Sequence, residues 1–189
     1  MASGFPLLTR SFLESPVVDL HGYPYFVNPV SDGIPRMDRD LLEEIVDGIV
    51  SVADLDCDRV LAPEAMGIPL AVGVTLRTGI PYSVIRKRSY GLPGEIGLDQ
   101  TTDYSESPMY INGILPGDRV ALLDDVISTG GTVRAIVSAL RSAGAVVTEV
   151  VAVFSKCTDI PGLESDLGVP VRHLLRVSSE GGKPRVLSG

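Results

Sequence analysis

The segment 118–143 changes its pattern twice within a short distance. It opens with an apolar run, continues through two adjacent carboxylates, Asp124 and Asp125, and turns at Gly130 and Gly131. A predicted helix then runs to the end of the segment. Because a buried strand that leads into a helix is typical of a right-handed βαβ crossover, the segment predicts a parallel sheet.

Strand-like and helix-like segments alternate along most of the chain. Aromatic residues make up only 5% of it and Trp is absent, so the core must come from Val, Leu, Ile and Ala. That composition is typical of parallel strands covered by helices. The 189 residues suit one domain, and we expect an α/β fold with an open, mostly parallel, twisted sheet and helices on both faces. The expected helices cover about residues 7–14, 38–55, 67–78 and 131–143, and the expected strands cover 59–63, 82–88, 118–126, 145–156 and 169–177.

Two stretches fit neither pattern. Four prolines divide residues 16–35 into extended pieces, and this stretch holds Tyr23, Tyr25 and Phe26. The aromatic cluster is typical of a site for a flat ligand. A hydrophobic patch that closes one edge of the sheet is an equally good interpretation. The second stretch, about 89–107, is polar and contains several Gly and Pro residues. A loop of this length in a compact domain is usually functional or disordered.

The net charge of −8 limits the possible partners. Nucleic acids and anionic membranes are bound by basic patches, so we expect neither as a partner, whereas backbone amides and a metal ion can still accommodate a small phosphorylated ligand. Neither a membrane span nor a signal peptide is apparent, which predicts a cytoplasmic protein. The two Cys residues have neither disulfide nor metal-ligand spacing. The low Lys content fits either a high-salt host or a GC-rich genome.

The turn after the strand at 118–126 carries the chemistry. Ligands of such sheets bind beyond the carboxyl ends of the strands, where adjacent Asp124 and Asp125 are costly unless sugar hydroxyls or a magnesium ion satisfy them. The alternative is a merely polar turn, and neither G-x-x-x-x-G-K-[ST] nor a helix-opening G-x-G-x-x-G is present. Hydroxyls and the amides at the helix start would face a dianion; these residues are Ser128, Thr129, Gly130, Gly131 and Thr132.

The string LLDDVISTGGT resembles the phosphoribosyl pyrophosphate signature of type I phosphoribosyltransferases. From about residue 11 to residue 156 the order of segments is similar to the purine-type members, above all to the archaeal hypoxanthine/guanine group. The resemblance implies transfer of the 5-phosphoribosyl group from phosphoribosyl pyrophosphate to a purine base, with hypoxanthine or guanine favoured, giving a nucleoside 5′-monophosphate and pyrophosphate. It also implies Mg²⁺ as cofactor, a homodimer, a small N-terminal hood (about 1–37) and a flexible catalytic loop (about 89–107).

The same resemblance assigns roles at the turn. Asp124 and Asp125 would hold the ribose hydroxyls, directly or through Mg²⁺, so both are candidate metal-site residues. Asp125 is also a catalytic candidate, because a carboxylate helps to tolerate a cationic sugar ring. Residues 128–132 would wrap the 5-phosphate. The segment APEAMG takes the place of the loop that contacts pyrophosphate, where adenine-type relatives carry Arg in place of Met66; its candidate residues are Ala65, Met66 and Gly67.

Arg86, Lys87 and Arg88 form the densest basic run of the chain. A run of three is ordinarily a solvated strand edge, but beside a phosphate site it favours pyrophosphate capture. Lys87 and Arg88 are the binding candidates and Lys87 is a catalytic one. Further on, DYSESPMY is similar to a Tyr-x-x-Glu-like element of adenine-type enzymes, from which its YSES departs. Glu106 would there manage a proton near the leaving group or the base.

Four residues are candidates for the base. Phe154 and Lys156 stand at the end of a predicted strand, where an aromatic face can stack on a purine and a cation can meet an exocyclic oxygen. This pair favours 6-oxopurines over adenine; alternatively Phe154 belongs to the core and Lys156 is solvated. Phe26 and Asn28 are the other candidates for closing the base pocket.

Other functions stay open within the resemblance. An adenine or a pyrimidine (orotate or uracil) phosphoribosyltransferase is one alternative, and a non-catalytic regulator that senses phosphoribosyl pyrophosphate is another. Such regulators bind DNA through an added helix-turn-helix, for which the chain has no room, and a charge of −8 is unsuited to DNA. The sequence therefore favours an enzyme.

Overall fold

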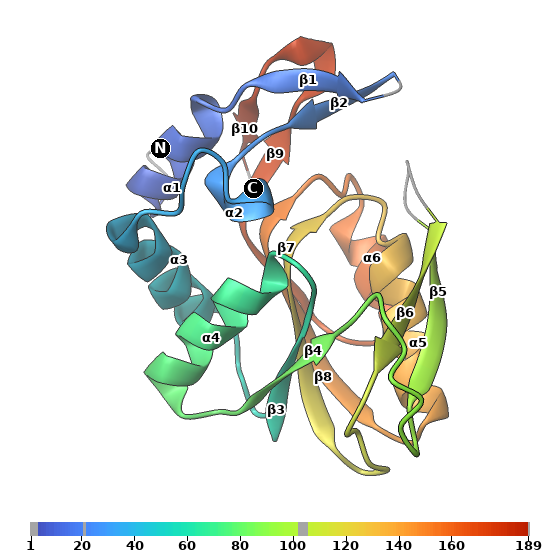
Figure 1. Ribbon diagram of the computed structural model, residues 1–189. Coiled ribbons are helices and arrows are strands. Elements are labelled where there is room, and N and C mark those ends of the chain that lie inside the picture. The colour runs from blue at the N-terminus through green and yellow to red at the C-terminus, as the bar shows by residue number, and fades with distance from the viewer. Residues whose placement is uncertain (1–3, 21, 102–105, 189) are drawn as a thin grey trace.

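A six-stranded sheet forms the centre of the protein (Figure 1). The computed structural model describes the backbone of residues 4–20, 22–101 and 106–188, and their side chains apart from those of 100–107. The strand order is β10-β9-β8-β7-β3-β4, and only the β9–β10 pair is antiparallel. This arrangement confirms the expected α/β fold. The strands are β3 (Arg59–Pro63), β4 (Tyr82–Ile85), β7 (Arg119–Ile127), β8 (Val146–Ser155), β9 (Val171–Ser178) and β10 (Arg185–Leu187).

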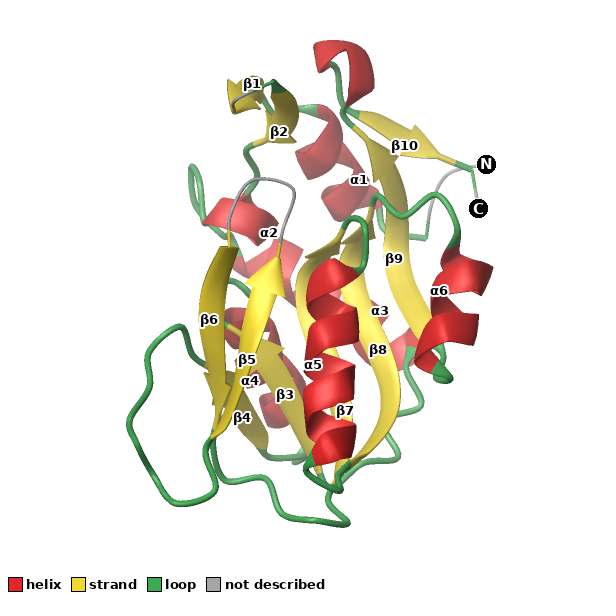
Figure 2. Cartoon of the chain, turned by 90° about the vertical axis from the view of Figure 1, so that its right-hand side faces the viewer, coloured by secondary structure: helices red, strands yellow, loops and turns green. Residues whose placement is uncertain are grey.

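Helices cover both faces of this sheet (Figure 2). Helices α1, α3 and α4 pack on one face, and α5 and α6 pack on the other. In the part of the chain that the structure describes, no helix is long and apolar enough to cross a membrane. The helices are α1 (Pro6–Leu13), α2 (Pro29–Asp32), α3 (Arg39–Val52), α4 (Gly67–Thr78), α5 (Gly131–Ser142) and α6 (Ile160–Leu167), with a 3₁₀ turn, η1, at Glu180–Gly182.

Strand β7 lies in the interior of the sheet, between β3 and β8. Successive side chains of a strand point to opposite faces, and Leu122 accordingly belongs to the apolar cluster under α5 while Leu123 belongs to the cluster under α3 and α4. Both faces of β7 are therefore covered by helices, which explains its unbroken apolar run. Asp124 and Asp125 follow Leu123 within β7, ahead of Val126 and Ile127, which again pack on the two apolar clusters.

The stretch expected to be one long loop contains a second, antiparallel pair of strands. Strand β5 (Ile96–Thr101) pairs with β6 (Glu106–Ile111), and this hairpin packs on α5. Met109 and Ile111 are buried in the cluster under α5, which gives the hairpin an apolar inner face. The prediction of a loop over 89–107 is therefore wrong in its second half, where strands β5 and β6 lie. Strand β5 contains Gly, Asp and Gln, which are poor strand formers. The alternation of apolar and polar residues that would predict a strand is therefore weak there.

The first half of that stretch is organised by one carboxylate. Glu95 accepts hydrogen bonds from Ser89 Oγ (2.5 Å), the backbone N–H of Tyr90 (2.9 Å) and Asn112 Nδ2 (2.8 Å). These donors, the Ser89 hydroxyl first, lower the pKa of Glu95 to about 2. The carboxylate therefore stays ionised and holds the turn at 89–95 together at any physiological pH.

The N-terminal residues form the region above the sheet in Figure 1. Strand β1 (Val17–Leu20) pairs antiparallel with β2 (Tyr23–Phe26), and α1 and α2 flank this hairpin. Helix α1 is fixed to α3, because the Glu44 carboxylate accepts the N–H groups of Leu7 (3.1 Å) and Leu8 (2.7 Å). These are first-turn amides without an intrahelical partner, so a side chain of α3 caps α1.

A second carboxylate, that of Glu149, also accepts backbone N–H groups and lies in the interior of the protein. Glu149 on β8 is 2% exposed, and its oxygens accept the N–H groups of Asp54 (3.2 Å) and Leu55 (2.7 Å). The two amides belong to the turn that connects α3 to β3. Glu149 therefore fixes the exit of α3 against the middle of the sheet.

Replacing Glu149 with Ala should destabilise the protein, because two amides lose their acceptor. Leaving a buried donor unpaired costs about 1–3 kcal/mol, so we expect the free energy of unfolding to fall by about 2–4 kcal/mol in urea titrations. Glu43→Ala is the matched control, because among the described residues its carboxylate pairs with the exposed Arg39, and an exposed pair contributes little to stability. Equal stabilities of the two variants would contradict this role of Glu149.

Candidate functional site

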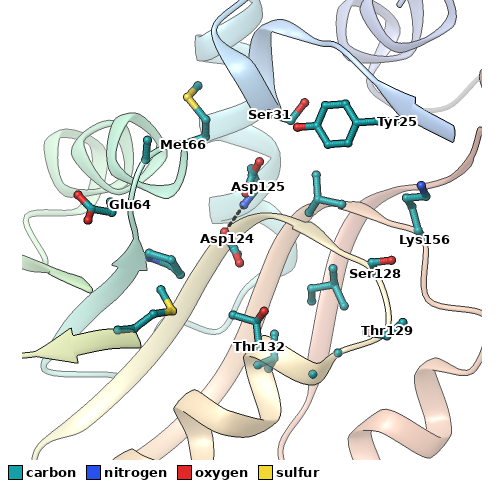
Figure 3. Close-up of a pocket in the computed structure, with 18 of the residues that line it drawn as sticks. Tyr25, Ser31, Glu64, Met66, Asp124, Asp125, Ser128, Thr129, Thr132 and Lys156 are labelled. Atoms are coloured by element: carbon teal, nitrogen blue, oxygen red, sulfur yellow. Dashed lines mark hydrogen bonds between the residues drawn. The ribbon is translucent and has the colours of Figure 1, made fainter. Parts of the chain in front are cut away.

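A pocket opens at the carboxyl edge of β3 and β7, below the β1–β2 hairpin (Figure 3). It collects residues from several separate parts of the chain. Most of the predicted site is included: the whole run 124–132, the loop after β3, Lys87 and Lys156. The lining residues are Tyr23, Tyr25, Phe26, Ser31, Pro63, Glu64, Ala65, Met66, Lys87, Met109, residues 124–133 and Lys156.

Asp124 and Asp125 stand at the centre of the pocket (Figure 3). The backbone N–H of Asp125 donates to Asp124 Oδ1 (2.9 Å). Burial raises the pKa of Asp124, and burial together with the charge of Asp124 raises the pKa of Asp125 well above its usual range. None of the ion pairs among the described residues involves either carboxylate. The pair therefore concentrates negative charge that a cation or hydroxyl donors of a ligand can satisfy.

The loop at 128–132 has the form of an anion site. Gly130 adopts a left-handed conformation (φ 81°), and a Cβ atom there would lie 2.8 Å from a methyl group of Leu163, so only glycine fits. Helix α5 begins at the next residue, and the first amides of a helix have no intrahelical acceptor and lie at its positive end. Arg134 braces the loop by donating to Thr129 O (2.9 Å) while pairing with Asp166 (2.8 Å).

The opposite wall comes from the loop after β3. Its Glu64 carboxylate accepts the backbone N–H of Lys87 (2.5 Å) and pairs with the Arg86 guanidinium (3.2 Å). This bond anchors the backbone of Lys87, whose side chain lines the pocket, as Ala65 and Met66 do. The peptide bond between Glu64 and Ala65 is cis.

Two residues expected on this wall lie elsewhere. The Arg88 guanidinium lies 5.9 Å from the centre of the Tyr90 ring and does not line the pocket. Gly67 is buried at the start of α4, where a Cβ would come within 3.2 Å of Ala62 Cβ and Leu123 O. Its small size serves the packing of α4 on the sheet. Neither residue belongs to the lining, and the pyrophosphate contacts expected of Arg88 and Gly67 stay predictions.

The far end of the pocket is aromatic and carries one cation. Tyr23 and Tyr25 alternate with Pro24 along β2, so both point to the same side. Lys156 follows β8, and its Nζ donates to Tyr23 OH (2.6 Å) while lying 4.3 Å from the centre of that ring. Phe26 also lines the pocket, although it is only 4% exposed. This end combines flat rings with an ammonium group.

Two expected base contacts are wrong. Phe154 is fully buried and packs against the rings of Phe12 (5.2 Å) and Phe26 (5.6 Å), so it cannot stack on a ligand. Asn28 is also fully buried: its Oδ1 accepts the Val30 N–H (2.9 Å) at the start of α2, and its amide donates to Ser15 Oγ (2.8 Å). Both residues hold the N-terminal region on the sheet. The side chain of Glu106 lies outside the described residues, and its role stays a prediction.

Sequence reasoning missed Glu64 and Ser31 in the lining. The first is a single acidic residue in a turn, and nothing in its neighbourhood marks it. The Tyr-x-Tyr spacing at Tyr23 and Tyr25 was a usable signal, because it places two rings on one face of a strand.

Among the described residues no cluster of three or more His, Cys, Asp or Glu side chains forms a complete metal site. The two aspartates nevertheless fit Mg²⁺. This ion commonly takes one or two carboxylates and completes its shell with water and substrate phosphates. Burial is the first cause of the raised pKa of both aspartates, so their ionised forms are costly without a counter-charge, which a divalent cation would supply.

Replacing Asp125 with Asn should stabilise the protein in the absence of ligands and divalent cations. Because its pKa is raised in the folded state, the stability contributed by this group is present at acid pH and is lost as the pH rises from the unfolded value through the folded one. We expect the melting temperature of Asp125→Asn to exceed that of the wild type by a few degrees at pH 7, since about 1 kcal/mol corresponds to about 2–4 °C at this size. The gain should be much smaller at pH 4.

Thermal denaturation at both pH values checks this expectation, with Asp54→Asn as the control at an exposed aspartate. A gain that is the same at both pH values would contradict it.

Known proteins are similar to this chain in sequence and in fold. The phosphoribosyl transferase domain family matches residues 39–164. The hypoxanthine/guanine phosphoribosyltransferase of Methanosalsum zhilinae is 50% identical over 90% of this chain and 89% of the relative, and that of Methanohalophilus mahii is 45% identical over 93% of each. The crystal structure of adenine phosphoribosyltransferase from Thermoanaerobacter pseudethanolicus has the same fold, with a TM-score of 0.71 at 20% identity over 89% of this chain and 99% of that one. The chain belongs to the phosphoribosyl transferase domain family.

Proposed function

We propose that the protein is a purine salvage phosphoribosyltransferase, which transfers the 5-phosphoribosyl group from phosphoribosyl pyrophosphate to hypoxanthine or guanine. The observation that carries this proposal is one pocket with three chemically distinct parts: a carboxylate pair, an anion loop and an aromatic end with an ammonium group. These parts match a ribose, its phosphate and a base in that order. Relatives 43–50% identical that are named hypoxanthine/guanine phosphoribosyltransferases support the choice of substrate.

The phosphoribosyl half of the substrate fits the centre of the pocket. The amides and hydroxyls of 128–132 bind the 5-phosphate at the start of α5, and Asp124 and Asp125 accept hydrogen bonds from the ribose hydroxyls. The same two carboxylates would hold Mg²⁺, which supplies charge neutralisation for the pyrophosphate when bound. Holding the sugar in one orientation accounts for part of the rate, because the reacting atoms are then already aligned.

Departure of pyrophosphate leaves positive charge on the ribose ring and negative charge on the leaving group. In this proposal Asp125 would lie beside the ring and stabilise the first charge, and Lys87, which lines the same pocket, would stabilise the second. Glu64 holds the Lys87 backbone, so the cation is presented from a fixed point. No covalent enzyme intermediate is needed.

The aromatic end receives the base. The rings of Tyr23 and Tyr25 offer flat surfaces, and the Lys156 ammonium is a donor for the exocyclic oxygen of a 6-oxopurine. Adenine phosphoribosyltransferases share the fold at 20–23% identity, which carries no argument for adenine as the base. The homodimer stays a prediction from the family resemblance.

Pyrophosphate release tests the function with Mg²⁺, phosphoribosyl pyrophosphate and, separately, hypoxanthine, guanine, xanthine, adenine, uracil and orotate. We expect turnover with hypoxanthine or guanine and its loss in Asp124→Asn/Asp125→Asn, while Asp54→Asn keeps wild-type activity. Binding of phosphoribosyl pyrophosphate without turnover of any base would instead indicate a sensor. Turnover of uracil or orotate alone would place the protein among pyrimidine enzymes.

Lys87 and its neighbour form a matched pair of variants. Lys87 lines the pocket and Arg88 does not, although both are exposed cations of the same run. Loss of one oriented donor in a preorganised site commonly costs about 10²–10³ in rate, so we expect kcat to fall by that factor in Lys87→Ala and by less than about twofold in Arg88→Ala. Steady-state kinetics with hypoxanthine measure kcat for both variants. Equal losses of kcat would mean that only the net charge of the basic run matters.

A further inference from the structure

Three side chains from distant parts of the chain meet at the base end of the pocket. Lys156 Nζ lies 2.6 Å from Tyr23 OH and 3.1 Å from Ser179 Oγ. Tyr23 lies on β2, Lys156 follows β8, and Ser179 follows β9. Of the three, Ser179 has no assigned role, although it is fully buried.

The direction of the hydrogen bonds at Ser179 is fixed by its partners. Ser179 Oγ lies 2.6 Å from the carbonyl oxygen of Pro24. A carbonyl oxygen can only accept, so the single hydroxyl proton of Ser179 is donated to Pro24. The Ser179 oxygen therefore presents a lone pair to Lys156, whose ammonium can only donate. The serine thus fixes the lysine and the β1–β2 hairpin together.

The Lys156 ammonium has more N–H donors than Tyr23 and Ser179 use. An ammonium group has three N–H donors; one is used by Tyr23 and one by Ser179. Within the part of the chain that the structure describes, the third has no hydrogen-bond partner, and because Lys156 lines the pocket, an acceptor on a ligand there can take it. The exocyclic oxygen of hypoxanthine or guanine is such an acceptor. The exocyclic amino group of adenine presents N–H groups, so it would set donor against donor and leave the ammonium unpaired.

We propose that Ser179 is a positioning residue that orients the Lys156 ammonium and thereby sets the preference for 6-oxopurines over 6-aminopurines. The inference rests on the proposed function and deepens it. Without Ser179, the lysine side chain regains rotational freedom and a second donor is released, so its remaining N–H no longer has one direction. Discrimination between the two base classes should fall, while the phosphoribosyl half of the pocket stays as it is.

The test measures binding separately from turnover. Calorimetric titrations with inosine 5′-monophosphate and adenosine 5′-monophosphate compare the wild type with Ser179→Ala, Ser179→Thr and the control Ser178→Ala, whose Oγ accepts from the Glu180 N–H instead. We expect Ser179→Ala to bind the inosine nucleotide about tenfold more weakly, the effect of one hydrogen bond to a charged group. The adenosine nucleotide should change by less than about twofold. Ser179→Thr restores the preference, and Ser178→Ala keeps it.

Other outcomes overturn the proposal. Equal weakening of both nucleotides in Ser179→Ala, or no change in either, contradicts a positioning role; so does a wild type that binds both nucleotides equally. If Ser179→Ala does not fold, Tyr23→Phe takes its place, because it removes the other acceptor and keeps the ring; it should lose the preference as well. A wild type that turns over no base but shows the preference, lost in Ser179→Ala, overturns the proposed enzymatic function and supports the role of Ser179.

Discussion

Parallel pairing of β7 with both β3 and β8 is the constraint on which the site depends. It brings the carboxyl ends of three strands to one edge of the sheet, so the loops that follow them share one pocket. The interior position of β7 also decides the surroundings of its polar residues: the two carboxylates lie between Leu123 and Ile127, which are both buried. Asp124 and Asp125 are consequently close to low-dielectric surroundings, which explains their raised pKa values and their demand for a counter-charge.

The parts that the sequence predicted are those in which a local pattern determines the outcome. Residues 118–143 contain a buried strand, a carboxylate pair and a glycine-assisted helix start in direct succession, and each step follows from backbone and solvation requirements within a few residues. The alternation of strands and helices similarly determined the parallel sheet, because crossover connections leave few arrangements. Such features depend on residues that lie close together in the chain, so a single sequence is enough to predict them.

The base end could not be predicted in the same way. Phe154 and Asn28 are residue types that often contact ligands, but both are buried in the protein interior. The Phe154 ring fills the core under the N-terminal region, and the Asn28 side chain caps α2 and bonds Ser15. Tyr23 and Ser179 are separated by more than 150 residues, and only the closure of the hairpin over β9 brings them to Lys156. Long-range contacts of this kind leave no periodic trace in a single sequence. The β5–β6 hairpin was missed for a different reason, since its strands contain weak strand formers.

The double contact of Arg134 has a consequence for the outer surface of the protein. One guanidinium holds the carbonyl of Thr129 in the anion loop and the carboxylate of Asp166 on α6, and Leu163 of the same helix fills the space beside Gly130. No residue of helix α6 lines the pocket, yet its contacts hold the loop at 128–132 in shape. We therefore expect amino-acid variation in α6 to be confined to its solvent-facing side, because its inward side supports the loop at 128–132.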